Sequence, residues 1–594
     1  MRRIATLLAT GLALLATTLT STGAGAAPGH TVQTLHFTVA VGPTGTQTCS
    51  VIGDLYLPAG ASADNRVPAV LTTNGFGGSK DDQAAWGAAL ADEGYAVLSY
   101  SGLGFGGSGC KITLDDPATD GKAAQQLVSY LAGTPGIAFT DAARTAPAPA
   151  LDVVQLDAPG DPRVGMVGGS YGGSVQYAAA SHDGRIDALV PLITWHDLSY
   201  SLAPNNLVPS STQRATPGAA KLIWALGFTG IGIAEGVKNY PADPNRLVGC
   251  PNFADFVCPA VVAAGVSGHT EPWIVRELRE RSIVSYAATV RAPTLIVQGQ
   301  SDTLFNLNES ISTYRTLEAQ GTETKLIWGN GGHSGPWAPG ELDLNTSDLR
   351  ASYIGGRILD WFDHHLKDAA VGTGPEFAYF RDWVSYDGVA TPAYGTSSTV
   401  DVGGSQRMVL SGTQLVPQGA PVAKGTSKFL AGVAGLPTSI DPIDAIGSLF
   451  DPVSSVPEVD LPGTFASYTT APLGSNLDVV GSPTLDLKVS APSSALTQLT
   501  GTSGQLVLFL KLAEVTPDGT ATIVRNLVAP VRVPNVNAPF TVRLPAITHR
   551  FDAGNSLRLV VAGGSTNYRG GFTPTAVSIT TGSTGNALTL PTTP

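Results

Sequence analysis

Hydrophobic and polar positions follow two different patterns in the two halves of the chain. In the first half, short apolar runs predict β-strands at residues 35–41, 50–57, 69–73 and 96–100. Residues 81–93 and 121–131 instead repeat apolar positions at helical spacing. Strands that alternate with helices indicate a mainly parallel sheet, with the first two strands as an antiparallel hairpin at its edge. A helix over residues 350–366 is expected to end this α/β domain, which spans residues 27–372.

The second half lacks helical periodicity. From about residue 397 onward, short β-rich runs separated by Gly, Pro, Asn and Asp occur at residues 484–489, 505–512, 521–524, 540–544 and 556–562. Regular short strands with turn signals are typical of an all-β sandwich or jelly roll. We therefore expect a jelly-roll domain over residues 397–594, joined to the first domain by a linker over residues 373–396.

Three predicted strands of the first domain each end close to a reactive side chain. The apolar run 164–167 leads into Ser170, a second run ends just before Asp302, and a third ends near His333. Between the first and second of these lies an insertion, about residues 199–287, that is helical and apolar in its middle. We expect this insertion to form a lid over a site at the three strand ends.

The segment Gly168-Gly169-Ser170-Tyr171-Gly172 has the pattern Gly-x-Ser-x-Gly between a strand and a helix. In that context the pattern is a nucleophile elbow, in which the glycines allow a sharp turn that exposes the serine hydroxyl. A tight structural turn is the alternative interpretation. The order Ser, Asp, His along the chain favours the α/β-hydrolase fold, with Ser170 as the nucleophile.

A serine nucleophile needs a base, and the base needs an orienting carboxylate. His333 lies in the glycine-rich loop Gly331-Gly332-His333-Ser334-Gly335, and Asp302 is the matching acid, with a turn aspartate as its alternative role. His196 is the competing base, because it also follows a strand that ends near the site. The elbow supplies the backbone N–H of Tyr171 as one oxyanion donor. The second is expected from the loop at residues 74–78.

The N-terminus has the parts of a secretory signal peptide over residues 1–26: Arg2 and Arg3, an apolar stretch, and a small-residue cleavage site. A membrane anchor is the alternative. We expect a secreted, extracellular protein without stable membrane insertion, because the best later candidate, residues 222–234, is too short to span a bilayer. Removal of the signal lowers the count of basic residues from 34 to 32 against 46 acidic ones, a net charge of −14. That charge argues against a nucleic-acid partner.

Four cysteines, Cys49, Cys110, Cys250 and Cys258, follow the predicted signal peptide and favour disulfides. Three pairings are possible, and we favour Cys49 with Cys110 and Cys250 with Cys258, since the latter two share a short proline-containing loop. A zinc site is disfavoured because CxxC spacing is absent. No metal or cofactor is expected.

At this point the chain resembles the Xaa-Pro dipeptidyl-peptidase-like hydrolases, a group that includes cocaine esterase, α-amino-acid ester hydrolases and glutaryl acylases. The segments that carry the resemblance are residues 162–173, 301–306 and 332–333 in the first domain, and 468–473, 481–483, 516–519 and 551–559 in the second. It implies an α/β-hydrolase with a helical lid and a C-terminal jelly roll, and with Ser170, Asp302 and His333 as the catalytic triad.

The oxyanion loop departs from the pattern of this family. Many relatives place a tyrosine there, whose hydroxyl supplies the second hydrogen bond, whereas alignment on Lys80 puts Phe76 at that position. We therefore expect a backbone N–H of Phe76 or Gly77 to supply the second oxyanion hydrogen bond. The glycine-rich segment at residues 100–109 is neutral where relatives tend to carry charges.

The sequence leaves the substrate open between a peptide and an ester. A dipeptidyl-peptidase needs an acidic partner for the free amino terminus of its substrate, and the candidates in the lid are Glu235, Asp255, Glu271 and Glu277. A carboxylesterase needs only an apolar pocket, which residues 222–234 could line. The third alternative is a non-catalytic protein that binds a carbohydrate or a surface through its jelly roll. Our prediction is a serine hydrolase of the dipeptidyl-peptidase type, with the esterase as its alternative.

Overall fold

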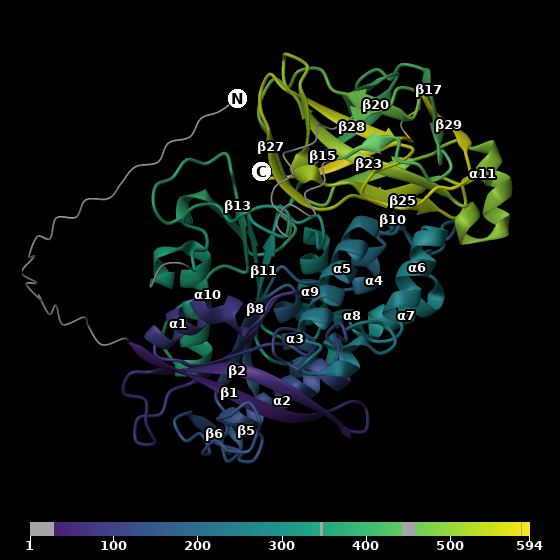
Figure 1. The fold of residues 1–594 in the computed structure, drawn as a ribbon. Helices are drawn as coiled ribbons and strands as arrows, with labels where there is room; N and C mark the ends of the chain where they lie inside the picture. The colour runs from purple at the N-terminus through teal and green to yellow at the C-terminus, as the bar shows by residue number, and fades with distance from the viewer. Residues whose placement is uncertain (1–28, 345–347, 442–458, 584, 594) are drawn as a thin grey trace, which may run out of the picture.

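The computed structural model describes residues 29–344, 348–441, 459–583 and 585–593. The signal peptide predicted over residues 1–26 lies outside these ranges. The described chain has two parts, an α/β domain and a β domain that packs on one end of it (Figure 1).

The α/β domain is built on a sheet of eleven strands within the described residues, in the order β14-β13-β12-β11-β9-β8-β3-β4-β2-β1-β5. Its parallel centre consists of β3 (Ala69–Thr73), β4 (Ala96–Tyr100), β8 (Val164–Gly169), β9 (Ile186–Leu192), β11 (Thr294–Gly299) and β12 (Thr324–Gly329). These strands are almost entirely buried, as expected for a parallel sheet with helices on both faces.

Helices cover both faces of this sheet. The apolar sides of α1 (Ala84–Asp92) and α10 (Tyr353–Lys367) share one core with the strands, and α2 (Lys122–Leu131) and α3 (Tyr171–Ala180) share another. A further helix, α9 (Leu307–Ala319), packs against β11 and β12. The sheet therefore holds the ends of β8, β11 and β12 in fixed relative positions.

The two edges of the sheet differ in how well the sequence predicted them. At one edge, β1 (His30–Val41) and β2 (Gln47–Pro58) form the expected antiparallel hairpin, and the short β5 (Ala138–Phe139) pairs outside it. At the other edge, β13 (Phe377–Phe380) and β14 (Tyr394–Ser397) extend the sheet beyond α10. The linker expected over residues 373–396 is thus wrong, because strands of four residues are too short to show a clear alternation.

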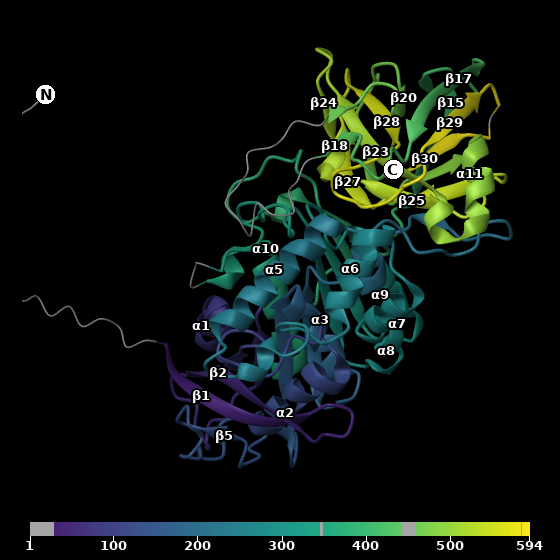
Figure 2. The same cartoon turned by 45° about the vertical axis from the view of Figure 1, so that its right-hand side comes forward.

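The C-terminal part is a β domain with one large apolar core. Its strands are β15 (Gly404–Ser411), β16 (Gln414–Pro417), β17 (Gly425–Ala431), β18 (Ser439–Ile440), β19 (Val459–Asp460), β20 (Phe465–Thr469), β21 (Leu477–Gly481), β22 (Thr484–Leu487), β23 (Leu506–Val515), β24 (Ala521–Ile523), β25 (Ala529–Val533), β26 (Phe540–Arg543), β27 (Ile547–Phe551), β28 (Ser556–Ala562), β29 (Thr575–Thr581) and β30 (Ala587–Thr592). One short helix, α11 (Pro492–Thr497), lies at its side (Figure 2).

The insertion between β9 and β11 carries five helices within the described residues: α4 (Leu198–Leu202), α5 (Leu222–Lys238), α6 (Val257–Ser267), α7 (Pro272–Glu280) and α8 (Ile283–Tyr286). Helices α5 and α6 lie side by side at the surface (Figure 2). Not all of the insertion is lid, however. Residues 203–220 run along the β domain, where β10 (Leu207–Val208) pairs with β26.

Two disulfides join Cys49 to Cys110 and Cys250 to Cys258, so the favoured pairing is confirmed. The first ties β2 to the loop that follows β4, and the second closes the segment in front of α6. Among the described residues, no helix has the length and apolar character needed to cross a membrane.

Candidate active site

The turn between β8 and α3 places Ser170 at a strained backbone position. Its φ is 57° and its ψ is −117°, in a region that residues with a side chain rarely adopt. The neighbouring glycines leave room for the turn: a Cβ atom on Gly172 would lie 2.3 Å from the carbonyl oxygen of Thr73, and one on Gly168 would lie 2.8 Å from that of Gly172. The geometry is that of a nucleophile elbow.

Ser170, His333 and Asp302 form one hydrogen-bonded row. The Nε2 atom of His333 lies 2.8 Å from the Ser170 Oγ, and its Nδ1 atom lies 2.7 Å from the Asp302 Oδ2. Asp302 is fully buried, and its Oδ1 accepts hydrogen bonds from the backbone N–H groups of Leu304 (3.0 Å) and Phe305 (2.7 Å). The three residues that the sequence singled out at three separate strand ends therefore meet.

Aromatic rings fix the orientation of the His333 imidazole. The ring of Phe305 meets it edge to face at a centroid distance of 5.1 Å, and the ring of Trp224 does so at 6.1 Å. Gly332, the residue before His333, packs closely on the loop that carries Asp302. A Cβ atom on Gly332 would lie 2.6 Å from the Ser301 carbonyl oxygen. One of these contacts comes from α5, so the lid takes part in holding the histidine.

The β domain also reaches the two loops that carry Asp302 and His333. From the segment after β24, Arg525 donates to the side-chain oxygens of Asn330 (2.8 Å) and Gln300 (3.0 Å). Gln300 precedes Asp302 by two residues, and Asn330 precedes His333 by three. Glu341 accepts the backbone N–H of Asn330 from the other side. The second domain therefore braces the loops of the site.

An apolar cavity opens beside Ser170. Apart from Ser170 it is lined by Phe76, Leu114, Tyr171, Trp195, Leu198, Leu202, Ala225, Phe228, Thr229, Phe253, Val257, Val261 and Phe305. Its volume is about 100 Å³. The wall that faces the sheet comes from the strand-end loops, and the rest comes from α4, α5, α6 and the segment before α6. The insertion thus provides most of the lining.

The loop expected to supply the second oxyanion donor lies beside Ser170. Phe76 and Gly77 are the central residues of a turn closed by a hydrogen bond from Gly78 N–H to the Gly75 carbonyl oxygen (3.1 Å). A Cβ on Gly75 would lie 3.8 Å from the Ser170 Cβ. The Phe76 ring has no donor and packs into the cavity wall, 4.9 Å from the ring centroid of Phe228. The donor roles of Tyr171, Phe76 and Gly77 stay predictions.

Buried carboxyl groups that the sequence did not single out lie beneath the site. Asp120 accepts from the Tyr171 hydroxyl (3.3 Å), and burial raises the pKa of Asp120 to about 7. Glu309 accepts the backbone N–H groups of His196 (2.7 Å) and Asp197 (3.1 Å), and burial raises its pKa to about 7 as well. Asp120 thus holds the first turn of α3, and Glu309 holds the loop after β9. Both roles depend on three-dimensional packing, so the sequence pattern does not show them.

His196, the competing base, belongs to a different group of side chains. Its Nδ1 lies 3.2 Å from the Thr313 hydroxyl on α9. Burial lowers the pKa of His196 to about 4. The contacts of the Ser170 hydroxyl point to His333 instead.

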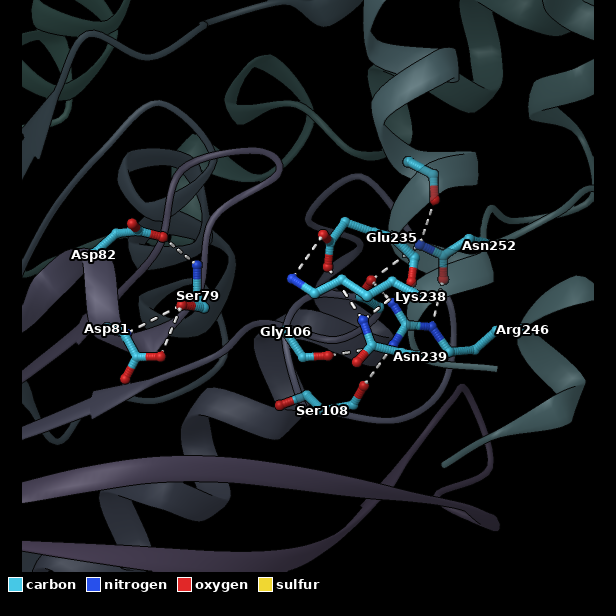
Figure 3. A network of polar contacts seen from close by, with 12 residues as sticks. Ser79, Asp81, Asp82, Gly106, Ser108, Glu235, Lys238, Asn239, Arg246 and Asn252 are labelled. Atoms are coloured by element: carbon cyan, nitrogen blue, oxygen red, sulfur yellow. Dashed lines mark hydrogen bonds and ion pairs between the residues drawn. The ribbon is translucent and has the colours of Figure 1, made fainter. Parts of the chain in front are cut away.

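The lid is anchored on the glycine-rich segment that follows β4. Arg246, which is buried, donates to the Ser108 carbonyl oxygen (3.2 Å) and to the Asn252 side chain (2.7 Å). Asn252 in turn donates to the carbonyl oxygens of Gly104 (3.0 Å) and, on α5, Gly232 (2.7 Å). Figure 3 shows Arg246 and Asn252 reaching between the lid and this loop. The neutral segment at residues 100–109 thus anchors the lid through its backbone carbonyl oxygens.

The fold and the row Ser170–His333–Asp302 define a serine hydrolase of the α/β-hydrolase class. Residues 49–222 and 270–335 match the profile of the X-Pro dipeptidyl-peptidase (S15 family), and residues 397–588 match that of the X-Pro dipeptidyl-peptidase C-terminal non-catalytic domain. The chain belongs to this family. The match leaves out residues 223–269, which form α5, α6 and the segment between them.

Solved structures share the fold over nearly the whole chain. An aminopeptidase from a marine sediment Thaumarchaeota archaeon has a TM-score of 0.60 at 12% identity and covers 95% of this chain and 96% of its own. An α-amino acid ester hydrolase has a TM-score of 0.59 at 15% identity, and the alignment covers 98% of this chain and 100% of the ester hydrolase. A CocE/NonD family hydrolase from Staphylococcus aureus has a TM-score of 0.58 at 13% identity, and the alignment covers 94% of this chain and 97% of that hydrolase. Among curated proteins, none matches the chain by sequence.

Proposed function

We propose that this protein is a secreted serine esterase that hydrolyses esters with a small apolar acyl group. His333 takes the proton of the Ser170 hydroxyl as Ser170 attacks the ester carbonyl, and Asp302 orients the imidazole and stabilises its charged form. His333 then returns the proton to the leaving alcohol. Water, activated by the same histidine, releases the acid from Ser170.

The observation that carries this choice of substrate is the lining of the cavity. Apart from Ser170, the lining residues are apolar or aromatic, and only Thr229 and Tyr171 among them carry a hydroxyl group. A free ammonium group buried there would need an anionic partner, since an unpaired charge in an apolar site is costly. An ester with an apolar acyl group requires no such partner.

The carboxylates that the sequence offered as partners for a peptide amino terminus are engaged with other groups. Asp255 pairs with Lys111 (3.0 Å), Glu277 with Arg281 (2.9 Å) and Glu271 with His269 (3.2 Å). Glu235 accepts from the Asn239 side chain (3.2 Å) and lies 3.5 Å from the Lys238 Nζ. The apolar cavity and these pairings favour the esterase over the dipeptidyl-peptidase that the sequence put first.

Secretion rests on the signal-peptide pattern at the N-terminus and on the disulfides. Four cysteines all engaged in two disulfides are typical of an oxidising compartment. Expression in a secreting host, followed by N-terminal sequencing of the protein from the medium, tests this part of the proposal. A mature protein that begins at or near Ala27 is the expected result, and retention in the cell with Met1 intact would contradict it.

Comparison of esters with a peptide substrate tests the activity. We expect purified protein to hydrolyse 4-nitrophenyl acetate, butyrate and benzoate and to leave alanyl-prolyl-4-nitroanilide intact. The cavity volume of about 100 Å³ compares with an apolar cavity of about 150 Å³ that binds benzene. Long-chain esters should therefore be poor substrates. Faster cleavage of the anilide than of every ester would establish the dipeptidyl-peptidase instead.

Enlarging the cavity should change the preferred acyl length. Phe228, on α5, lines the cavity and contacts Phe76 and Trp224, so Phe228→Ala removes a ring from the wall. We expect the ratio of kcat/KM for 4-nitrophenyl octanoate to that for the acetate to rise at least about tenfold, as one or two methylene groups in an apolar pocket typically contribute that much. Leu226→Ala is the matched control, because Leu226 lies on the same helix and is 54% exposed. If the octanoate-to-acetate ratio of kcat/KM is the same in Phe228→Ala and Leu226→Ala, the acyl group binds outside this cavity.

A further inference from the structure

A lysine is buried at the root of the lid. Lys221 immediately precedes α5, is 2% exposed, and donates its backbone N–H to the Leu202 carbonyl oxygen (2.7 Å). Its ammonium group forms no direct ion pair with any carboxylate of the described residues. It donates instead to the carbonyl oxygens of Thr303 and Leu304, each at 2.7 Å. Burying an ammonium ion is costly, so this position needs a physical explanation.

The two carbonyl groups belong to the same peptide units that hold the catalytic acid. The carbonyl carbon of Thr303 is bonded to the nitrogen of Leu304, and that of Leu304 is bonded to the nitrogen of Phe305. Those two N–H groups are the donors to the Asp302 Oδ1 (3.0 and 2.7 Å). Each peptide unit therefore has the Lys221 ammonium at its oxygen and the Asp302 carboxylate at its N–H.

This arrangement joins a buried cation to a buried anion through two aligned peptide dipoles. Each peptide unit carries a dipole of about 3.5 D, positive at its N–H and negative at its oxygen. The ammonium polarises both units, which strengthens the hydrogen bonds that they donate to the carboxylate. Asp302 is fully buried, so these fixed dipoles take the place of water around its carboxylate.

We propose that Lys221 is a positioning residue for catalysis, which holds the Asp302 carboxylate aimed at His333 through the Thr303–Leu304 and Leu304–Phe305 peptide units. The inference rests on the proposed role of Asp302. It also makes the acid dependent on the lid, since α5 begins at the next residue. The neighbouring Ala220 is fixed by a backbone hydrogen bond from Arg569 of the β domain (2.7 Å), so the second domain helps to set the position of the lysine.

Replacement of the lysine tests the inference through kcat. Lys221→Met, which keeps the length and removes the charge, should lower kcat for 4-nitrophenyl butyrate by about 10- to 100-fold, a usual effect of losing an outer partner of a reacting group. KM should stay unchanged, because Lys221 does not line the cavity. Lys221→Gln keeps a donor without the charge and should fall between Met and wild type, and Lys221→Arg should recover most of the activity.

The matched control is Lys325→Met. Lys325 is also a largely buried lysine that donates to a backbone carbonyl oxygen, that of Gly374, but it lies at the start of β12, away from the acid loop. We expect its kcat to remain near the wild-type value. Thermal unfolding of all variants, followed by circular dichroism, separates loss of fold from loss of rate.

The pH profile provides a readout that a merely structural lysine would not change. Burial lowers the pKa of Lys221 to about 8, against the opposing influence of Asp302 and Glu309. As pH rises through about 8 the ammonium loses its proton, the two peptide units lose their cation, and kcat of the wild type should fall. Lys221→Met should lack this alkaline fall, and Lys221→Arg should displace it to higher pH. Glu309 interacts with the same ammonium, so its titration also changes in Lys221→Met, whereas Lys221→Arg keeps a cation beside it.

The outcomes separate this inference from the proposed function. Labelling of Ser170 by a fluorophosphonate, absent in Ser170→Ala, establishes the nucleophile whatever Lys221 does. A folded Lys221→Met with wild-type kcat, equal losses in Lys221→Met and Lys325→Met, or an alkaline limb that persists in Lys221→Met would each overturn the role of Lys221. If Lys221→Met does not fold, the pH profiles of Lys221→Gln and Lys221→Arg decide by the same criteria.

Discussion

Ser170→Ala is expected to lower kcat for 4-nitrophenyl butyrate by about a million-fold, the usual consequence of removing the nucleophile of a serine hydrolase. The substitution removes only the hydroxyl that lies 2.8 Å from the His333 Nε2. The strained backbone at this position is the same for alanine as for serine, so the fold should persist. Ester hydrolysis and covalent labelling by a fluorophosphonate probe both measure the effect.

Ser181→Ala provides the control for this prediction. Ser181 caps the other end of α3, and its hydroxyl donates to the Ala178 carbonyl oxygen. The chemical change is identical, so activity and labelling should stay at the wild-type level. Full labelling of Ser170→Ala would show that another residue carries the nucleophile.

The sequence predicted the three residues of the site because each lies where a parallel strand ends. Ser170 also carries its own local signal, since the glycines around it are required by the approach of the Thr73 backbone. Asp302 and His333 have weaker local signals and were identified by their order along the chain. Parallel strands bring such ends to one edge of the sheet, and the hydrogen bonds at 2.7 and 2.8 Å follow from that topology.

Residues that act through tertiary packing left no such signal. Lys221 precedes an apolar run and resembles an ordinary charge at a helix start, and only its contacts with the carbonyl oxygens of Thr303 and Leu304 distinguish it. Glu309 likewise lies within an amphipathic helix, and its contacts with the loop after β9 depend on how α9 docks. Pairing over long separations cannot be derived from periodicity.

The linker expected over residues 373–396 differs from the structure for a related reason. Phe377–Phe380 and Tyr394–Ser397 are each too short for a strand pattern to be distinguished from loop, yet they complete the first sheet. Within the insertion, Leu207–Val208 joins a strand of the second domain. The two domains therefore share structure, in agreement with the contacts of Arg525 to the loops that carry Asp302 and His333.

Asp302→Asn is expected to lower kcat by about 10,000-fold while leaving the fold unchanged, the magnitude seen when this substitution is made in a serine-protease triad. The reason lies in the two N–H groups of Leu304 and Phe305 that point at the Oδ1 position. They require an acceptor there, so the amide oxygen must take that place and the NH₂ group must face the His333 Nδ1. The imidazole then carries its proton on Nε2 and cannot accept the one from Ser170.

Asp197→Asn is the control for that prediction, because Asp197 caps α4 beside His196, the competing base. Its side chain accepts from the Ser199 backbone N–H and hydroxyl, bonds that an asparagine oxygen also accepts, so kcat should stay near the wild-type value. The rates of ester hydrolysis and of fluorophosphonate labelling measure both variants. A loss of kcat in Asp197→Asn as large as in Asp302→Asn would indicate that His196, and not His333, is the catalytic base.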